Sequence, residues 1–297
     1  MSDGEAARSG QPRDAARGLV DPEAAALVRA FGRRTPRRPP LSAQASRDPM
    51  FRRAGSSFDL KNIREYQSTD DPRRIEWKLE GRTDRLFVKE YYDEERDGAA
   101  VLVDLSASLG VYGAAEAKRV GATIAWMLGA LGVPTSLEAF AGRTLRRLSR
   151  QRGGKSTAPI ASFFAGLEPE GRTDISAAVA SARAASRYRR LVLVSDFFDR
   201  DWSPRSSPFA RNCFVRLYRP FSDLRPGRAE VDVEDPETGR RLRLPWDAAA
   251  EAAYARREAE LDAAFREAAR RGAYYGILRP GEPRRTLYWS LLEALYA

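Results

Sequence analysis

Short apolar runs alternate with helix-length segments from residue 99 to the end of the chain, and this alternation limits the possible folds more than any other feature. Two of the runs, Ala99–Val103 and Leu191–Val194, contain only Ala, Val and Leu. Such runs are typical of strands that are buried on both faces of a sheet. Because parallel strands need crossover connections, usually helices, the alternation predicts an α/β fold with a doubly wound, mostly parallel sheet.

The elements that we expect in this domain, residues 99–297, follow from apolar periodicity and turn residues. They are strands over 99–103, 136–140, 145–148, 191–194, 214–218 and 274–278, and helices over 114–131, 159–167, 174–186, 248–271 and 286–295. A β-hairpin inserted near 229–246 is expected to turn at Glu237-Thr238-Gly239, since glycine suits such turns. We therefore expect one Rossmann-like domain with a hairpin grafted onto it.

The first 98 residues have a different character. Residues 1–50 are rich in Ala, Arg, Pro and Ser, a composition that buries too little apolar surface to offset the entropy lost on ordering. We expect a disordered basic tail with one short helix between Asp21, as N-cap, and Gly32. Residues 51–98 are expected to be a β-rich segment, because apolar and polar residues alternate over 57–60 and 86–91.

The chain contains no histidine and a single cysteine, Cys213. These counts exclude a Ser-His-Asp triad, a Cys-His pair, an imidazole metal ligand and a cysteine zinc site. Any bound metal must therefore take oxygen ligands, which favours magnesium, calcium or manganese. The absence of a cysteine framework and of an apolar signal segment indicates a cytoplasmic protein.

The net charge is +10. A basic excess is compatible with binding to nucleic acid or to an anionic surface through the basic tail. The charges are not gathered on one helix face, so scattered solvated side chains are the preferred interpretation and nucleic acid is an unlikely partner. The long uncharged stretch 120–137 is interrupted by Gly and Pro, so we expect no membrane span.

Oxygen-bearing side chains stand where three of the predicted segments end. Asp104, Ser106 and Ser108 follow the strand 99–103, Thr173 precedes a helix, and Asp196 follows the strand 191–194. In a parallel sheet these points lie at the carboxyl edge and meet at the topological switch point. Two carboxylates and three hydroxyls suit a hard cation with room for water and one outside ligand. Helix capping is the alternative for the serines, and for Thr173 with its neighbour at 174.

The order Asp104-x-Ser106-x-Ser108, then Thr173, then Asp196, resembles the metal-ion-dependent adhesion site of von Willebrand factor A domains. The stretch from Arg64-Glu65-Tyr66 to Lys78, with Gly81-Arg82-Thr83 and Val88-Lys89-Glu90 after it, is similar to the opening of the bacterial domain-of-unknown-function 58 proteins. Thr69 and Leu109 depart from that pattern, where the family usually has Gly and Met.

This resemblance implies a von Willebrand factor A-like fold and a bound Mg²⁺ or Mn²⁺ ion. Ser106, Ser108 and Thr173 would be ligands or lie next to the ion, while Asp104 and Asp196 would orient waters and hydroxyls. It also implies that the protein works with a MoxR-type AAA+ ATPase in assembling or maturing other proteins. The partner would be this ATPase, a protein client, or both.

The polar stretch near the N-terminus is expected to form a salt-bridged clasp between the N-terminal strands and the core. Its arginines would be held bidentately by carboxylates. The alternative is a surface that faces a partner. The residues concerned are Arg64, Glu65, Tyr66, Asp70, Asp71, Arg73, Arg74, Trp77, Lys78, Arg82 and Lys89.

Our leading hypothesis is a non-enzymatic interaction module with no small-molecule substrate, whose metal engages an acidic group of a partner. A rival is a metal-dependent phosphohydrolase with Asp104 as nucleophile. Such enzymes generally need a carboxylate two residues later as acid/base, and here that place is Ser106. Gly153-Gly154-Lys155-Ser156-Thr157 resembles part of a P-loop, but Ser149 stands where that motif needs glycine.

Overall fold

The structure is a computed structural model of the chain. It describes residues 18–34, 60–68, 70, 72, 75–83, 85–91, 98–151, 157–185, 188–218, 230–245 and 247–296. The chain divides into two compact units. We call residues 1–34 with 97–297 the main unit and residues 35–96 the small unit.

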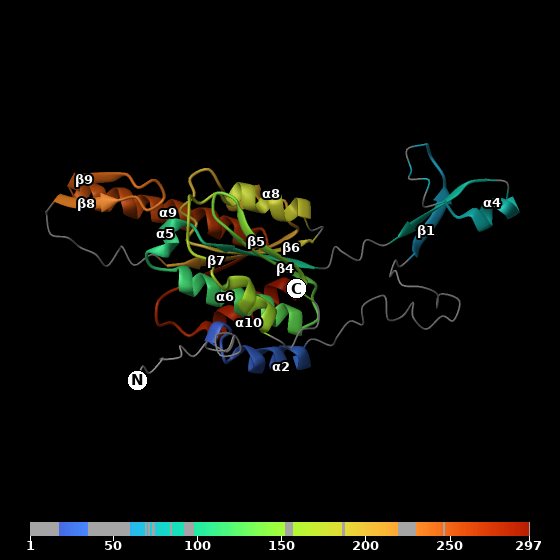
Figure 1. The fold of residues 1–297 in the computed structure, drawn as a ribbon, viewed down its shortest axis with the longest axis horizontal. Coiled ribbons are helices and arrows are strands. Elements are labelled where there is room, and N and C mark those ends of the chain that lie inside the picture. The colour runs from blue at the N-terminus through green and yellow to red at the C-terminus, as the bar shows by residue number, and fades with distance from the viewer. Residues whose placement is uncertain are drawn as a thin grey trace, which may run out of the picture. The chain divides into compact units, whose positions relative to one another are not determined.

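A six-stranded sheet forms the centre of the main unit (Figure 1). Its strands are β3 (Ala99–Asp104), β4 (Thr135–Phe140), β5 (Thr144–Gln151), β6 (Arg190–Ser195), β7 (Arg211–Leu217) and β10 (Tyr274–Leu278). The order across the sheet is β10-β7-β6-β3-β4-β5, and only β5 at one edge runs antiparallel to its neighbour. The prediction of a mostly parallel α/β sheet is confirmed.

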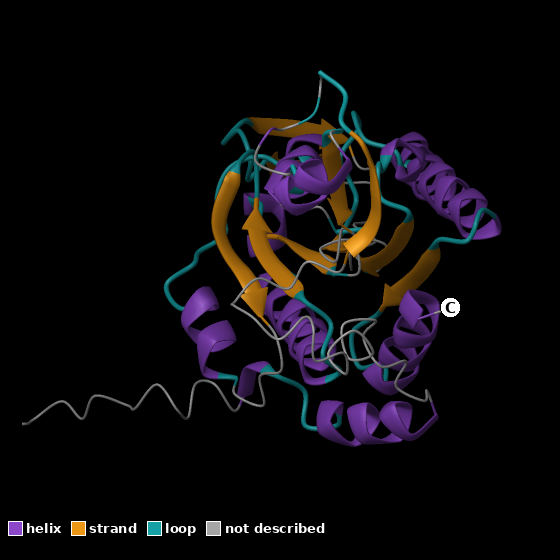
Figure 2. Cartoon of the chain, turned by 90° about the vertical axis from the view of Figure 1, so that its right-hand side faces the viewer, coloured by secondary structure: helices purple, strands orange, loops and turns teal. Residues whose placement is uncertain are grey.

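Helices cover both faces of this sheet, as Figure 2 shows. One apolar core lies under α2 (Ala24–Arg34), α6 (Ala114–Ala130), α7 (Ala158–Phe164) and α10 (Arg284–Tyr296). The other lies under α8 (Ile175–Ala185) and α9 (Ala248–Arg270). Within β3, Val101 faces the first core and Leu102 the second, so the central strand is buried on both sides.

The short helix predicted between Asp21 and Gly32 is present as α2. Leu27 and Phe31 are buried, and the backbone N–H of Asp21 donates to the hydroxyl of Thr123 in α6. The carboxylate of Asp21, predicted as an N-cap, accepts hydrogen bonds from Arg284 and Tyr288 of α10. The apolar stripe of α2 packs against α6 and α10, so residues 18–34 belong to the main unit. The rest of the predicted tail lies outside the described residues.

The predicted hairpin is present as β8 (Glu230–Glu234) and β9 (Arg241–Pro245), paired antiparallel. Gly239 has φ 69° at the predicted turn, a left-handed conformation that glycine adopts without steric cost. The helix α9 follows directly, and the Asp247 carboxylate caps it by accepting from the N–H groups of Ala249 and Ala250.

In the small unit, β1 (Leu60–Glu65) pairs antiparallel with β2 (Phe87–Tyr91), and a short helix, α4 (Trp77–Thr83), lies between them in sequence. The sequence predicted the first strand over 57–60, of which residues 57–59 lie outside the described residues; β1 begins at Leu60 and runs through the polar residues that follow. The register of β1 is that of its backbone pairing with β2. The pairs Ile63–Lys89 and Arg64–Val88 each place an apolar residue opposite a polar one, so no simple apolar alternation marks the register in the sequence.

Candidate metal centre

The switch point of the sheet lies between β3 and β6, which are neighbours and parallel. The chain leaves β3 toward β4 on one side, and it leaves β6 toward β7 on the other. Asp104 is the last residue of β3, and Asp196 directly follows β6. Ligand sites of open α/β sheets form at such a point, outside the carboxyl ends of the strands.

The Asp104 carboxylate is completely buried and held from two strands. Its Oδ1 accepts a hydrogen bond of 2.9 Å from the backbone N–H of Ser106, and its Oδ2 accepts one of 2.6 Å from the Ser195 hydroxyl. The Ser195 Oγ in turn accepts from the backbone N–H of Phe197 at 3.0 Å. This chain of bonds fixes the carboxylate between the ends of β3 and β6.

Ser106 and Ser108 bring their hydroxyls together at the start of α5 (Ala107–Gly110), with the two Oγ atoms 3.1 Å apart. Ser106 is the N-cap residue of this helix, yet its side chain makes no capping hydrogen bond. Both serines are buried. The capping interpretation therefore does not explain why two hydroxyls stand side by side here.

Thr173 lies in a loop that backbone hydrogen bonds tie to the end of β3. The N–H of Ala107 donates to the carbonyl of Gly171, and the N–H of Glu170 donates to that of Leu105, both at 3.0 Å. Asp174, next to Thr173, caps α8 through a 2.7 Å bond from the N–H of Ala177. Asp174 thus provides the cap. The Thr173 hydroxyl donates instead to the carboxylate of Glu237, at 3.1 Å.

Asp196 completes the predicted set and is also buried, with 1% of its surface exposed. Its Oδ2 accepts a 2.6 Å hydrogen bond from the Tyr112 hydroxyl, and its Oδ1 accepts from the N–H of Phe198 at 3.0 Å. Phe197, between them in sequence, has φ 62°, and its ring is fully buried. A left-handed backbone costs a residue with a side chain about 1–2 kcal/mol, so packing holds a strained turn beside the carboxylate.

The two carboxylates influence each other electrostatically. The pKa of Asp104 is raised to about 7, mainly by burial and in addition by the negative charge of Asp196. Hydrogen bonds from Ser195 and Ser106 oppose this rise. The structure thus brings Asp104 and Asp196 close enough to repel, a situation that a bound cation relieves.

The donor set fits a small hard cation. Magnesium holds oxygen ligands at 2.0–2.1 Å in an octahedron, so adjacent ligands stand about 3 Å apart, and the Ser106 and Ser108 hydroxyls have this spacing. Within the described residues, no group of three or more His, Cys, Asp and Glu side chains is arranged to hold a metal. Hydroxyls and water would thus supply most ligands here.

In the small unit, Arg64 donates two hydrogen bonds to Asp70, of 2.8 Å and 2.6 Å. Glu65 accepts from Arg85, which the sequence analysis did not single out. Tyr66 donates its backbone N–H to Leu86. These contacts stabilise the small unit itself.

Other members of the predicted clasp bear less directly on it. The Trp77 side chain is 62% exposed, and the N–H of Lys78 donates to Glu76. Arg82 lies in α4 and Lys89 in β2. Asp71, Arg73 and Arg74 lie outside the described residues. A bridge from these residues to the core stays a prediction.

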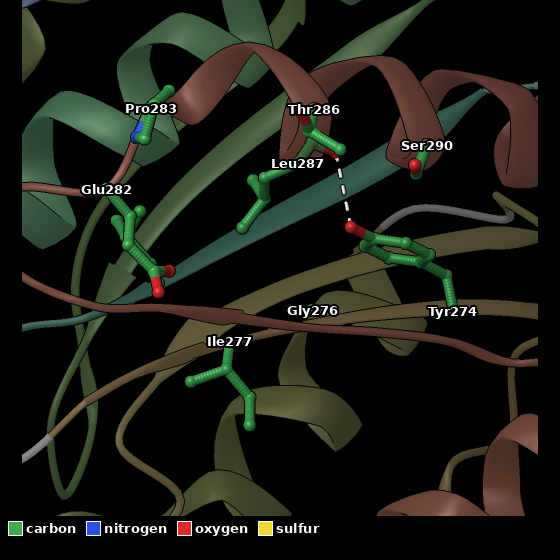
Figure 3. A pocket seen from close by; sticks show the side chains of 9 residues that line it. Tyr274, Gly276, Ile277, Glu282, Pro283, Thr286, Leu287 and Ser290 are labelled. Carbon is green, nitrogen blue, oxygen red and sulfur yellow. Dashed lines mark hydrogen bonds between the residues drawn. The ribbon is translucent and has the colours of Figure 1, made fainter.

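A separate pocket of about 220 Å³ lies between β10 and the start of α10. Figure 3 shows its wall, where the Tyr274 hydroxyl donates to the carbonyl of Leu287 at 3.2 Å. None of the five predicted site residues lines it. This pocket is therefore distinct from the candidate metal centre.

Fold and site together define an α/β protein with a cluster of buried carboxylates and hydroxyls at the switch point of its sheet. Residues 62–264 match the family model described as "Protein of unknown function DUF58", and the chain belongs to this family. A search of the curated proteins finds no match. None of the helices in the described ranges has the length and apolar character needed to cross a membrane.

Two solved structures are similar to the chain. One is the conserved hypothetical protein BatB from Bacteroides thetaiotaomicron, with 12% identity and a TM-score of 0.45. The other is an aerotolerance-related membrane protein from Bacteroides fragilis NCTC 9343, with 14% identity and a TM-score of 0.41. Each alignment covers 67% of this chain and 98% of the other chain.

Proposed function

We propose that this protein is a non-enzymatic interaction module with a von Willebrand factor A-like domain. It binds Mg²⁺ or Mn²⁺ at the metal centre and uses the ion to hold an acidic group of a partner protein. One observation carries the proposal: two neighbouring serine hydroxyls, 3.1 Å apart, stand beside a pair of buried carboxylates that repel each other. A divalent cation would take the hydroxyl oxygens as ligands and would offset the repulsion between the two carboxylates.

The low charge of the ligand set supports an acidic partner. Asp104 already accepts hydrogen bonds from Ser106 and Ser195, one on each oxygen, and in our proposal it acts on the ion through water. An ion held mainly by neutral hydroxyls keeps much of its positive charge and attracts an anionic oxygen from outside. A glutamate or aspartate side chain of a partner provides such an oxygen.

The same geometry argues against the rival reaction. A phosphoryl nucleophile must present an oxygen to its substrate, whereas the Asp104 carboxylate is 0% exposed. By the family resemblance, the proposed partner is a MoxR-type AAA+ ATPase or a protein client of assembly or maturation.

Calorimetric titration with MgCl₂ tests the ion site. Wild-type protein should bind one equivalent, Asp104→Ala should not, and Asp201→Ala, which removes an exposed carboxylate from the loop after β6, should bind like wild type. If Asp104→Ala does not fold, the double variant Ser106→Ala with Ser108→Ala takes its place and should likewise not bind Mg²⁺. Equal heats in wild type and in both site variants would reject the proposal.

A further inference from the structure

The tip of the β8–β9 hairpin touches the candidate metal centre. The Thr173 hydroxyl donates a 3.1 Å hydrogen bond to Oε1 of Glu237, a residue 64 positions later in the chain. Figure 1 shows the hairpin at the same end of the main unit as α5, the helix that carries Ser108. A carboxylate of the protein itself thus lies against one of the proposed ligands.

The hairpin turn holds Glu237 in a defined position. The Asp235 carboxylate accepts from the backbone N–H of Glu237 at 3.0 Å and from the Thr238 hydroxyl at 2.6 Å. The backbone N–H of Gly239 also donates to the carbonyl of Asp235, at 2.7 Å. These three bonds lock the turn, so Glu237 is presented from an ordered tip.

The tip also lies within electrostatic reach of the same loop. The hydrogen bond from Thr238 is the main reason why the pKa of Asp235 lies below its usual value, and the positive charge of Arg172 lowers it as well. Arg172 is the neighbour of Thr173 in the chain. The tip thus contacts the Thr173 loop through the hydrogen bond between Thr173 and Glu237, and the charge of Arg172 favours the ionised form of Asp235 in the same turn.

Glu237 differs from the acidic residues on the hairpin strands. Glu234 pairs with Arg241 at 2.8 Å, and Asp232 pairs with Arg243 at 2.9 Å, across the two strands. Within the described part of the chain, Glu237 has no such basic partner, and its carboxylate bonds to Thr173. Its negative charge is therefore available to a cation at this site.

We propose that Glu237 is a ligand of the metal centre supplied by the chain itself, and that it occupies the position a partner's acidic group must take. This inference rests on the proposed function. A tethered carboxylate competes at high effective concentration, so the free protein holds its metal in a closed form. A partner binds by displacing Glu237, so its apparent affinity is its intrinsic affinity multiplied by the fraction of the protein in the open form.

Manganese binding followed by water-proton relaxation tests the inference. In wild type, Glu237 fills a coordination position, whereas in Glu237→Ala a water molecule takes its place. We expect Glu237→Ala to bind Mn²⁺ roughly tenfold more weakly or worse, with a higher relaxivity for each bound ion. Glu234→Ala, on the adjoining strand, removes a carboxylate that pairs with Arg241 and should change neither value.

The outcomes separate the two proposals. If wild type and Glu237→Ala bind Mn²⁺ with the same affinity and relaxivity, the inference is wrong and the metal site stands. If neither protein binds Mn²⁺, the proposed function fails and the inference fails with it. A change of the same size in Glu234→Ala would also overturn the inference, because the effect would then be one of general charge.

Discussion

Ser195, the last residue of β6, donates a 2.6 Å hydrogen bond to the carboxylate of Asp104, the last residue of β3. The two residues are 91 positions apart in the chain. Parallel pairing of β3 with β6 brings them together, and both are completely buried. This bond links the fold to the site, because it orients a carboxylate at the point where the chain changes direction across the sheet.

Replacing Ser195 by Ala should destabilise the protein by about 1–3 kcal/mol, because a buried carboxylate oxygen loses its donor. Urea unfolding followed by circular dichroism measures this loss. Ser176→Ala is the control, since Ser176 is exposed on α8 and surface changes usually stay within about 0.5 kcal/mol. Equal unfolding midpoints for the two variants would show that the Ser195 bond carries little energy.

The contribution of Asp104 to stability without metal should fall as the pH rises from about 4 to about 7. The pKa of Asp104 is raised to about 7 in the folded protein, mainly by burial. In the unfolded chain it returns to about 3.9. Between these values the folded state binds more protons than the unfolded state, so the free energy of unfolding decreases with pH. The contribution of Asp104 has a slope of at most about 1.4 kcal/mol per pH unit.

Urea titrations in EDTA at several pH values measure this slope, and Asp104→Asn isolates the contribution of Asp104. The difference between wild type and variant should change across this pH range and level off above pH 7. Adding Mg²⁺ should flatten the wild-type curve, since a cation favours the ionised carboxylate. A wild-type curve parallel to that of Asp104→Asn throughout would contradict the prediction.

Phe31→Ala should destabilise the main unit by about 3–5 kcal/mol, the usual effect of emptying a buried phenylalanine site. The ring of Phe31 is 4% exposed and packs edge-on against Trp289 and Tyr296 of α10, at 5.6 Å and 5.2 Å between centroids. Thermal or urea unfolding measures the change. Arg29→Ala, exposed on the same helix, should have little effect. A disordered tail would make both variants neutral.

The sequence was most informative where burial alone decides the structure. The strands that end at Asp104 and before Asp196 are covered on both faces, so their apolar runs stand out. The alternation of strands and helices predicted a parallel sheet, and this placed both residues at its carboxyl edge. Gly239 marked the hairpin turn, because a left-handed residue is needed there. These elements depend on local composition, which a single sequence displays.

Other features depend on how distant segments dock, and local composition does not show this. Glu237 was visible as part of a turn, but its contact with Thr173 arises from the docking of the hairpin. Tyr112 donates to Asp196. Its position four residues after Ser108, about one helical turn, was the one weak sign in the sequence that it lies near the site. The helix α2 sits in a polar, arginine-rich segment, and its burial is fixed by α6 and α10.

The most direct measurement is the anomalous diffraction of a crystal soaked in MnCl₂. The account predicts one strong manganese peak within coordination distance of the Ser106 and Ser108 hydroxyls, with Thr173 next to it and Asp104 and Asp196 held through water. A fully soaked crystal with no peak there, or with manganese bound only elsewhere on the protein, would contradict the account.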